Sequence, residues 1–495
     1  MSQAQQAADD AGALLLGRAL AMIAESAVLI IVVRLLGKAE VGALAGLLVV
    51  CQTVAIVATA GMPASLLMML PGQTVGVRRA LARQHLVALH LLGVLAGVAL
   101  AGYAVAARAG WIDDPESADL LWMLPYPLFD LPARALPNLL VVEGRARVSA
   151  QLAVGKSLLT SAATLVPVAL GLPVWQVALC VTAAAGLNWA VVPLAFARLY
   201  RDAPAQRGAP AVGVGGVLRH ALPLGLTDIV GAIAQRLDRH LVLFFFSAEV
   251  FAEYQVGAWQ IPLIVNVPYA VGTACAAPMR QLFGQDRGAE AIALWQASIR
   301  KVSLVVVPVS MVFLVAAPAV VELLFTAEYV RAVPVFRCYT ALTMMRVAAF
   351  GIVLVAAARP RDVLVSAVAS LGFAVLLQLP LALALGPVGP ALGAVLAFFP
   401  TVAIYTVQIA RAAGTSRWRT FPLGDYARLC LWAAVPGVLA HLVVAAIAPG
   451  PVVALLLTAV IVLGGFAVLA TRAKDMGTAE WRYLGRWLRL RQLQR

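Results

Sequence analysis

The chain has 495 residues, of which 62% are hydrophobic and only 12% charged, and its mean hydropathy is +0.92. A soluble globular chain carries charge on about a quarter of its residues, so this composition excludes a soluble enzyme. The net charge of +14 does not indicate nucleic-acid binding, because the basic residues stand beside apolar runs rather than on a soluble module. The five cysteines have neither metal-site nor disulfide spacing. The sequence predicts a polytopic membrane protein.

Apolar windows long enough to cross a bilayer as helices, about 20 residues each, recur along the whole chain. They lie at 13–35, 41–66, 84–107, 118–142, 148–171, 174–197, 218–246, 250–278, 298–324, 332–357, 362–385, 388–411, 425–448 and 451–471. Lys and Arg test this set, because they collect in cytoplasmic loops. Alternate loops and the C-terminal end hold 26 of the 37 Lys and Arg residues, and the intervening loops hold four. We therefore expect an all-α protein with about 14 transmembrane helices and both termini cytoplasmic.

Three short motifs occur twice, in the same order. Ala-Glu-Val at 39–41 recurs at 248–250, Leu-x-Gly-Gln-x-x-Gly at 70–76 recurs at 282–288, and Leu-Val-x-x-x-Arg-x-Arg at 140–147 recurs at 354–361. The repeats predict a duplicated six-helix unit whose copies share one orientation, with a substrate path between them. The expected parts are an N-terminal lobe at 1–201, a cytoplasmic linker at 202–217, a C-terminal lobe at 218–412, two further helices at 413–472 and a basic amphipathic cytoplasmic tail at 473–495.

Charged residues interrupt several of the predicted helices, most densely in LTDIVGAIAQRLDRHLVLFFF at 226–246. Each charge at the centre of a membrane helix costs about 2.5–3.5 kcal/mol unless it meets a partner or a wet cavity. At 100° per residue, Asp228, Gln235 and Arg239 fall on one side of this helix, with Arg236 and Asp238 flanking them. These charges either neutralise one another to hold the bundle together or face a substrate path.

Other predicted helices carry charges at related positions. The first has Arg18 and Glu25 seven residues apart, and the fourth has Asp130 and Arg134 among four prolines, which predicts a break or kink. The embedded charges are net positive, which favours an anionic substrate, and Arg suits phosphate. The candidate substrate-binding residues are Arg18, Arg134, Lys156, Arg236, Arg239, Arg337, Arg346 and Gln235. The candidates for coupling or charge balance are Glu25, Asp130, Asp228 and Asp238.

Four segments carry a family resemblance: LDRHLVLFFFSAEVFAEYQVG at 237–257, AAPMRQLFGQDRGAEAIALWQASIRK at 276–301, ELLFTAEYVRAVPVFR at 322–337 and LGPVGPALGAVLA at 385–397. In these the chain resembles the polysaccharide flippases, of the O-antigen type, within the multidrug/oligosaccharidyl-lipid/polysaccharide exporter superfamily. The resemblance implies a two-lobed bundle that moves an undecaprenyl-diphosphate-linked saccharide across the bacterial inner membrane by alternating access. It also matches Asp238-Arg239 to an acidic-basic pair of the family. The chain departs from the family where Thr326 and Ala327 stand before the acidic residue, in place of the usual Gly.

We therefore expect a flippase, not an enzyme, that carries a lipid-linked saccharide from the cytoplasmic to the periplasmic leaflet. Its partners would be this substrate, membrane lipid and other glycan assembly proteins such as a polymerase, without nucleic acid. No cofactor or metal is expected, and proton or sodium coupling is left open. The alternatives are a cation-coupled multidrug exporter of the same fold, a saccharide polymerase or ligase, and a transport-dead scaffold for glycan assembly. The longest predicted external loop, at 108–117, is short for a polymerase.

Overall fold

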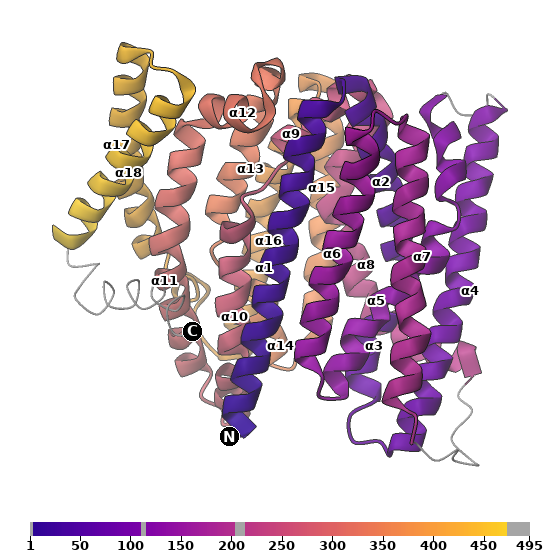
Figure 1. Ribbon diagram of the computed structural model, residues 1–495. Coiled ribbons are helices and arrows are strands. Elements are labelled where there is room, and N and C mark those ends of the chain that lie inside the picture. Colours follow the sequence, from indigo (N-terminus) through magenta and orange to yellow (C-terminus); the bar gives the residue numbers. More distant parts are fainter. Residues whose placement is uncertain (1–2, 110–114, 203–212, 473–495) are drawn as a thin grey trace. The chain divides into compact units, whose positions relative to one another are not determined.

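The computed structural model describes residues 3–109, 115–202 and 213–472, in which every regular element is a helix (Figure 1). The chain divides into two compact units. Unit 1 comprises Met1–Gln255 with Ala367–Pro390, and unit 2 comprises Val256–Ser366 with Ala391–Arg495. The predicted amphipathic tail at 473–495 and residues 203–212 of the predicted linker lie outside the described residues. The lobe boundaries inferred from the repeats stay a prediction.

Unit 1 is a helical bundle with an extended apolar core. Its elements are α1 (Gln3–Leu35), α2 (Lys38–Ala58), α3 (Met62–Met69), α4 (Val75–Arg108), η1 (Pro115–Met123), α5 (Tyr126–Val142), α6 (Ala146–Ala169), α7 (Val174–Leu199), α8 (Gly213–Phe245), most of α9 (Ala248–Gly257) and most of α15 (Pro360–Leu385). Met62, Leu89 and Leu131 are fully buried in the core, where small residues such as Ala88 let the helices approach. Helix α1 runs beside α6 (Figure 1), and Gly17 makes room for Ala150 at this contact.

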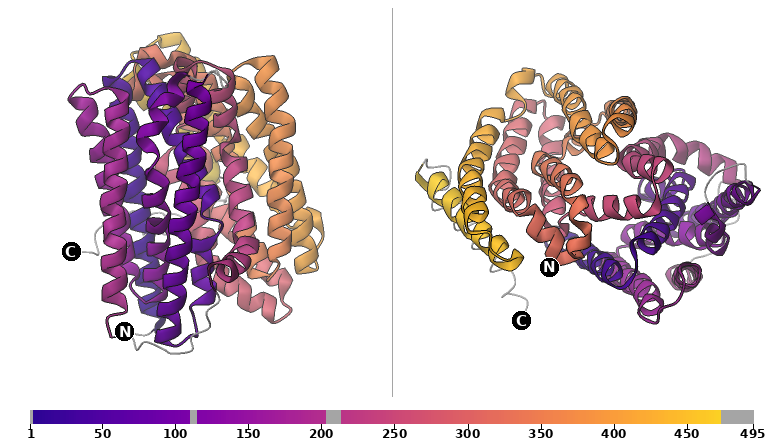
Figure 2. Two further views of the ribbon diagram at one scale, coloured as in Figure 1. Left: turned by 90° about the vertical axis from the view of Figure 1, so that its right-hand side faces the viewer. Right: turned by 90° about the horizontal axis from the view of Figure 1, so that it is seen from above.

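Unit 2 is built from the remaining helices. They are α10 (Pro262–Gly284), α11 (Gly288–Val315), α12 (Ala317–Phe325), η2 (Ala327–Ala332), α13 (Val333–Met345), α14 (Phe350–Ala356), most of α16 (Val388–Ala413), η3 (Arg417–Arg419), α17 (Leu423–Ile447) and α18 (Pro451–Arg472). The buried side chain of Trp295 packs edge-on against Phe350 and Phe421 in its core. Helices α17 and α18 follow one another as a packed antiparallel pair, drawn in yellow tones (Figure 2).

Eleven segments of the described chain are long and apolar enough to cross a membrane. The chain is thus an all-helical, multi-pass membrane protein, as predicted. The three remaining predicted spans correspond to η1 with α5, to α8 and to α9 with α10. Helix α5 is only 17 residues long, α8 carries the dense charges, and α9 and α10 are separate helices. The predicted total of about 14 spans therefore depends on the three segments that are most polar or most interrupted.

Several predicted membrane helices are interrupted in the structure. A turn at Leu124 and Pro125 separates η1 from α5, which bears out the break expected from the proline-rich sequence, although α5 itself continues through Pro132 and Pro137. The predicted helix at 41–66 ends at Ala58 and restarts as α3. The predicted helix at 332–357 is broken at 346–349, between α13 and α14. Each break frees backbone polar groups, which inside a membrane must be satisfied within the protein.

The two copies of Leu-Val-x-x-x-Arg-x-Arg form the same helix C-terminus. After α5, the Arg145 amide donates to the Leu140 carbonyl at 2.8 Å, and after α14 the Arg359 amide donates to the Leu354 carbonyl at 2.9 Å. The residue preceding each arginine, Gly144 or Ala358, has a positive φ of 71° or 56°. This is the left-handed helix cap in which an amide reaches back to the last turn. The sequence repeat therefore has a local structural counterpart.

A backbone contact within unit 1 joins α3 to α8. Gly61, at the N-terminal cap of α3, has φ 73°, and a Cβ placed on it would overlap the Cα of Gly225. The reverse also holds, since a Cβ on Gly225 would overlap the Cα of Gly61. Close backbone approach at small residues is the usual basis of helix packing in membranes. Two glycines here let α8 lie directly against the turn before α3.

We expect the substitution Gly61→Ala to destabilise the protein by about 2–4 kcal/mol, because it adds a backbone overlap to a left-handed conformation. Gly72→Ala is the matched control: Gly72 has φ 78°, but a Cβ there meets open space. The control should lose only about 1 kcal/mol of stability, the part that comes from placing alanine in a left-handed backbone conformation. Unfolding of the purified variants in detergent measures both effects. Equal losses for the two variants would show that the contact with Gly225 has no energetic importance.

Candidate functional site

A buried carboxylate on α5 holds two cations. Asp130 is 2% exposed; its Oδ2 accepts from Arg134 Nε at 2.5 Å, and its Oδ1 accepts from Lys156 Nζ on α6 at 2.8 Å. Arg134 is one turn further along α5, the spacing at which helix side chains meet. Arg134 and Lys156 are themselves 28% and 40% exposed. The carboxylate is thus fully desolvated and doubly paired, whereas its cations reach open space.

Tyr126 extends this network and was missed by the sequence reasoning. It is buried one turn before Asp130 on α5 and interacts electrostatically with both Asp130 and Arg134. The signal was present, because positions 126, 130 and 134 are four residues apart and share one face of a helix. Tyr126 carries no charge, so a pattern of embedded charges does not reveal it. The face of α5 toward the site is therefore a Tyr-Asp-Arg row.

The charges continue onto α1. Glu25 lies within electrostatic range of Lys156 on α6 and of Arg18 on its own helix. Contact between the two helices is fixed near this point, since Ser157 Oγ on α6 donates to the Ala21 carbonyl of α1 at 3.1 Å. Arg18 and Glu25 are both exposed side chains. The structure thus brings Arg18 and Glu25 of α1 near Lys156 and Asp130, which stand much further along the sequence.

Arg236 of α8 joins the site from another side. The charges of Arg239 and Arg134 both act on it, which places three guanidinium groups near one another. Its Nη1 is buried, and within the described chain that atom has no hydrogen-bond partner. A buried N–H without a partner costs about 1–3 kcal/mol, more when the group is charged. Arg236 is therefore a cation positioned to receive an acceptor.

Two other polar residues of α8, Asp238 and His240, have identified contacts inside unit 1. Asp238, 2% exposed, accepts a hydrogen bond from the Tyr254 hydroxyl of α9 at 2.6 Å. His240 Nε2 lies 2.9 Å from Thr53 Oγ1 of α2. Tyr254 and Thr53 were not singled out in the sequence, because neither lies in a motif. These contacts attach α8 to its neighbours and fix the orientation of its polar side.

The structure does not bring all predicted site residues into this group. Asp228 and Gln235 are exposed on α8, Asp228 two turns before Arg236. Arg337 and Arg346 belong to unit 2, where both are exposed. Arg346 follows the last residue of α13, at the beginning of the break before α14. For these four residues a role in the site stays a prediction.

We define the charge track as Arg18, Glu25, Lys156, Asp130, Arg134, Arg236 and Arg239, all in unit 1. It contains five cations and two carboxylates, and the buried Asp238 beside it adds a third carboxylate. Such an excess of positive charge favours an anion, and guanidinium groups bind phosphate oxygens in pairs. In the described residues no group of His, Cys, Asp and Glu side chains could hold a metal ion.

The sequence comparison decides the family. Residues 31–334, more than half of the chain, match the family described as "Polysaccharide biosynthesis protein". The chain belongs to this family. The resemblance seen in the sequence is thereby confirmed. Comparison with the curated proteins gives no match.

Solved structures show the fold of this polysaccharide biosynthesis protein. It matches "Lipid II flippase MurJ, inward closed conformation" with a TM-score of 0.69 at 10% identity, over 94% of this chain and 99% of that one. A multidrug resistance MATE family transporter in an inward-facing conformation matches with a TM-score of 0.58 at 15% identity, over 80% and 96% of the two chains. A MOP superfamily transporter from Pyrococcus furiosus, with a binding pocket of reverse polarity, matches with a TM-score of 0.55 at 16% identity, over 82% of this chain and 95% of that one. The sequence match thus gives the family, and the likeness to these three structures shows that the chain shares their helical membrane fold.

We expect Asp130→Asn to destabilise the polysaccharide biosynthesis protein by about 1–3 kcal/mol, because Arg134 and Lys156 each lose a charged partner while both stay partly exposed to solvent. The control is Asp362→Asn, whose carboxylate is 31% exposed and pairs with Arg359 at 3.6 Å. Exposed pairs contribute about 0–1 kcal/mol. Thermal unfolding of both variants in detergent gives the comparison. If Asp130→Asn were no worse than its control, the buried network would not stabilise unit 1.

Proposed function

We propose that this protein is a flippase that moves an undecaprenyl-diphosphate-linked saccharide from the cytoplasmic to the periplasmic leaflet of a bacterial inner membrane by alternating access. The observation that carries the proposal is the charge track, with its excess of embedded cations. Membership of the polysaccharide biosynthesis family makes a lipid-linked saccharide the fitting anion. The diphosphate of such a substrate is the group that its arginines would bind.

Arg236 has the clearest role in this proposal. Its Nη1 is buried among cations and has no partner in the described chain, so a phosphate oxygen would supply the missing acceptor. Arg239 and Arg134 would add positive charge on either side. Asp130 keeps Arg134 and Lys156 in place and lowers their mutual repulsion while the site is empty. Glu25 and Asp238 would balance charge in the same way.

A cation-coupled drug exporter is the rival, since the fold is shared with the MATE transporter. Cationic drugs require a site with excess negative charge, because like charges repel strongly where water is scarce. The charge track has the opposite sign. The comparison of folds therefore leaves both functions open, and the sign of the embedded charge favours the flippase.

We expect Arg236→Gln to lower saccharide export about tenfold to a hundredfold. The reason is the loss of one charge-assisted hydrogen bond to the substrate, which contributes about 1.5–3 kcal/mol. Arg359→Gln is the control, because Arg359 is 46% exposed and lies in unit 2. Surface glycan of cells that carry each variant is measured, with membrane levels of the protein determined in parallel. Full export by a normally inserted Arg236→Gln variant would exclude Arg236 from the binding site.

Cells that lack the protein should accumulate the lipid-linked saccharide on the cytoplasmic face of the membrane, because the substrate is made there and is not moved. Periodate, to which the inner membrane is impermeable, oxidises only saccharide exposed on the periplasmic face of spheroplasts. Protection of the accumulated saccharide supports the flippase. Its oxidation would indicate a block after translocation, as in a polymerase, and unchanged levels of the saccharide would leave drug export as the better proposal.

A further inference from the structure

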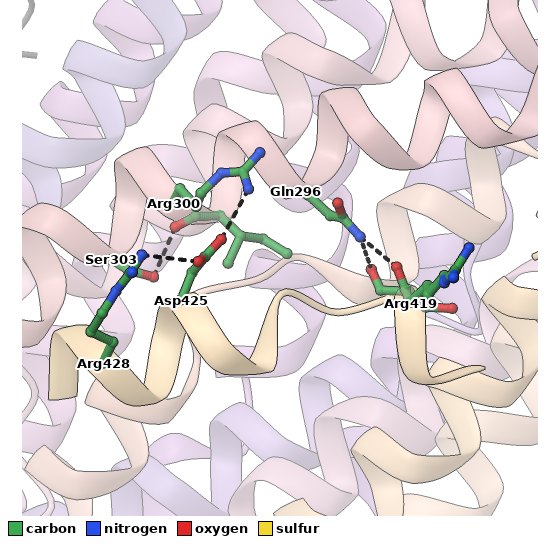
Figure 3. A network of polar contacts seen from close by, with 8 residues as sticks. Gln296, Arg300, Ser303, Arg419, Asp425 and Arg428 are labelled. Atoms are coloured by element: carbon green, nitrogen blue, oxygen red, sulfur yellow. Dashed lines mark hydrogen bonds and ion pairs between the residues drawn. The ribbon is translucent and has the colours of Figure 1, made fainter. Parts of the chain in front are cut away.

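Unit 2 contains a cavity of about 260 Å³ between α11 and α17 that plays no part in the charge track. It is lined by Arg300, Leu304, Asp425, Arg428 and Leu429. Its polar residues point toward one another in Figure 3, with Arg300 on α11 and the other two on α17. Positive and apolar side chains therefore meet in one small cavity.

Two arginines share one carboxylate in this cavity. Asp425 Oδ2 accepts from Arg300 Nη1 at 3.0 Å, and Oδ1 accepts from Arg428 Nη2 at 3.1 Å (Figure 3). Arg300 is 48% exposed and Arg428 46% exposed. Each guanidinium group has five N–H donors, so a single carboxylate cannot satisfy all the donors of two guanidinium groups. The cavity keeps a net positive charge, because it holds two guanidinium groups and one carboxylate.

A basic and aromatic turn is fastened beside the cavity. On α11, Gln296 Nε2 donates to the carbonyls of Arg419 and Thr420 at 2.5 and 3.1 Å, which attaches the turn η3 to α11 (Figure 3). Trp418 in η3 is 77% exposed, and the guanidinium of Arg417 lies 5.0 Å from its ring centroid. Exposed tryptophan and arginine together are typical of the level at which membrane lipids carry their headgroups.

At the level of Arg300 and Arg428, the surfaces of α11 and α17 change from polar to apolar. Beyond Arg300 and Lys301, α11 continues as VSLVVVPVSMVFLV. Beyond Arg428, whose guanidinium lies 5.4 Å from the Trp432 ring centroid, α17 exposes an apolar row at helical spacing. This row consists of Leu431, Val435, Val438 and Leu442, each at least 55% exposed. A cationic cavity thus adjoins an apolar helix face that is long enough for an acyl chain.

We propose that the cavity between α11 and α17 binds the headgroup phosphate of an anionic phospholipid, with an acyl chain along the exposed row of α17. The phosphate oxygens accept from Arg300 and Arg428, and Trp418 lies at the glycerol level. A free phosphate would use the cation pair but not the apolar row. The site lies in unit 2, and the lipid is a membrane component rather than the transported substrate, so the proposal does not rest on the proposed function.

Native mass spectrometry of the purified full-length protein in detergent, titrated with phosphatidylglycerol, tests this proposal. Each arginine near an anionic lipid contributes about a fivefold gain in affinity, so we expect the Arg300→Gln/Arg428→Gln variant to bind about 25-fold more weakly. The matched control is Arg287→Gln/Arg359→Gln, which removes two exposed, ion-paired arginines of unit 2 outside the cavity. The control should bind as the unaltered protein does.

Single variants cover the case in which the double variant does not fold, because Arg300→Gln and Arg428→Gln should each weaken binding about fivefold. Phosphatidylcholine, which is zwitterionic, and inorganic phosphate should each bind much more weakly than phosphatidylglycerol. Undiminished binding of phosphatidylglycerol to the cavity variants would overturn the proposal. So would equal binding of phosphatidylcholine, or displacement of phosphatidylglycerol by inorganic phosphate at equal concentration.

Discussion

A carboxylate sealed inside an apolar bundle is tolerated only while cations neutralise it, and Asp130 satisfies this condition twice. That requirement determines much else in unit 1. It places Arg134 one turn away on α5 and Lys156 on α6, and Lys156 in turn connects Asp130 to Glu25 on α1. The cations outnumber the carboxylates that they neutralise, and this surplus is the basis on which we propose the charge track as a binding site for an anion.

Local sequence was sufficient for most of the fold. Hydropathy located the membrane helices, and the prolines before Asp130 predicted the interruption between η1 and α5. The interruption at Arg346 was not predicted, because the segment from 332 to 357 forms one hydrophobic window despite Arg337 and Arg346, and its only proline, Pro334, stands near its start. The break between α2 and α3 was missed as well. Its Gly61 is needed for a tertiary contact with Gly225, which no local pattern reveals.

The site was predictable to the extent that it lies on single helices. The pairing of Asp130 with Arg134 follows from their spacing of four, and Tyr126 would have followed from the same rule. The contact between Asp130 and Lys156 does not follow, because it joins two helices across 26 residues of sequence. Contacts such as that of Asp238 with Tyr254 depend in the same way on how helices pack. Sequence therefore identified the charged residues more readily than their partners.

The two bonds of Asp130 differ in what happens to them when helices move. Arg134 travels with Asp130 because both belong to α5, whereas Lys156 belongs to α6. If α6 slides past α5, only one of the two bonds breaks, and the carboxylate is never stripped of its last cation. Rearrangement inside this bundle is thus protected from the full penalty of an isolated buried charge. The bond within α5 keeps the carboxylate paired during such a movement. The bond between α5 and α6 is the one that can exchange partners.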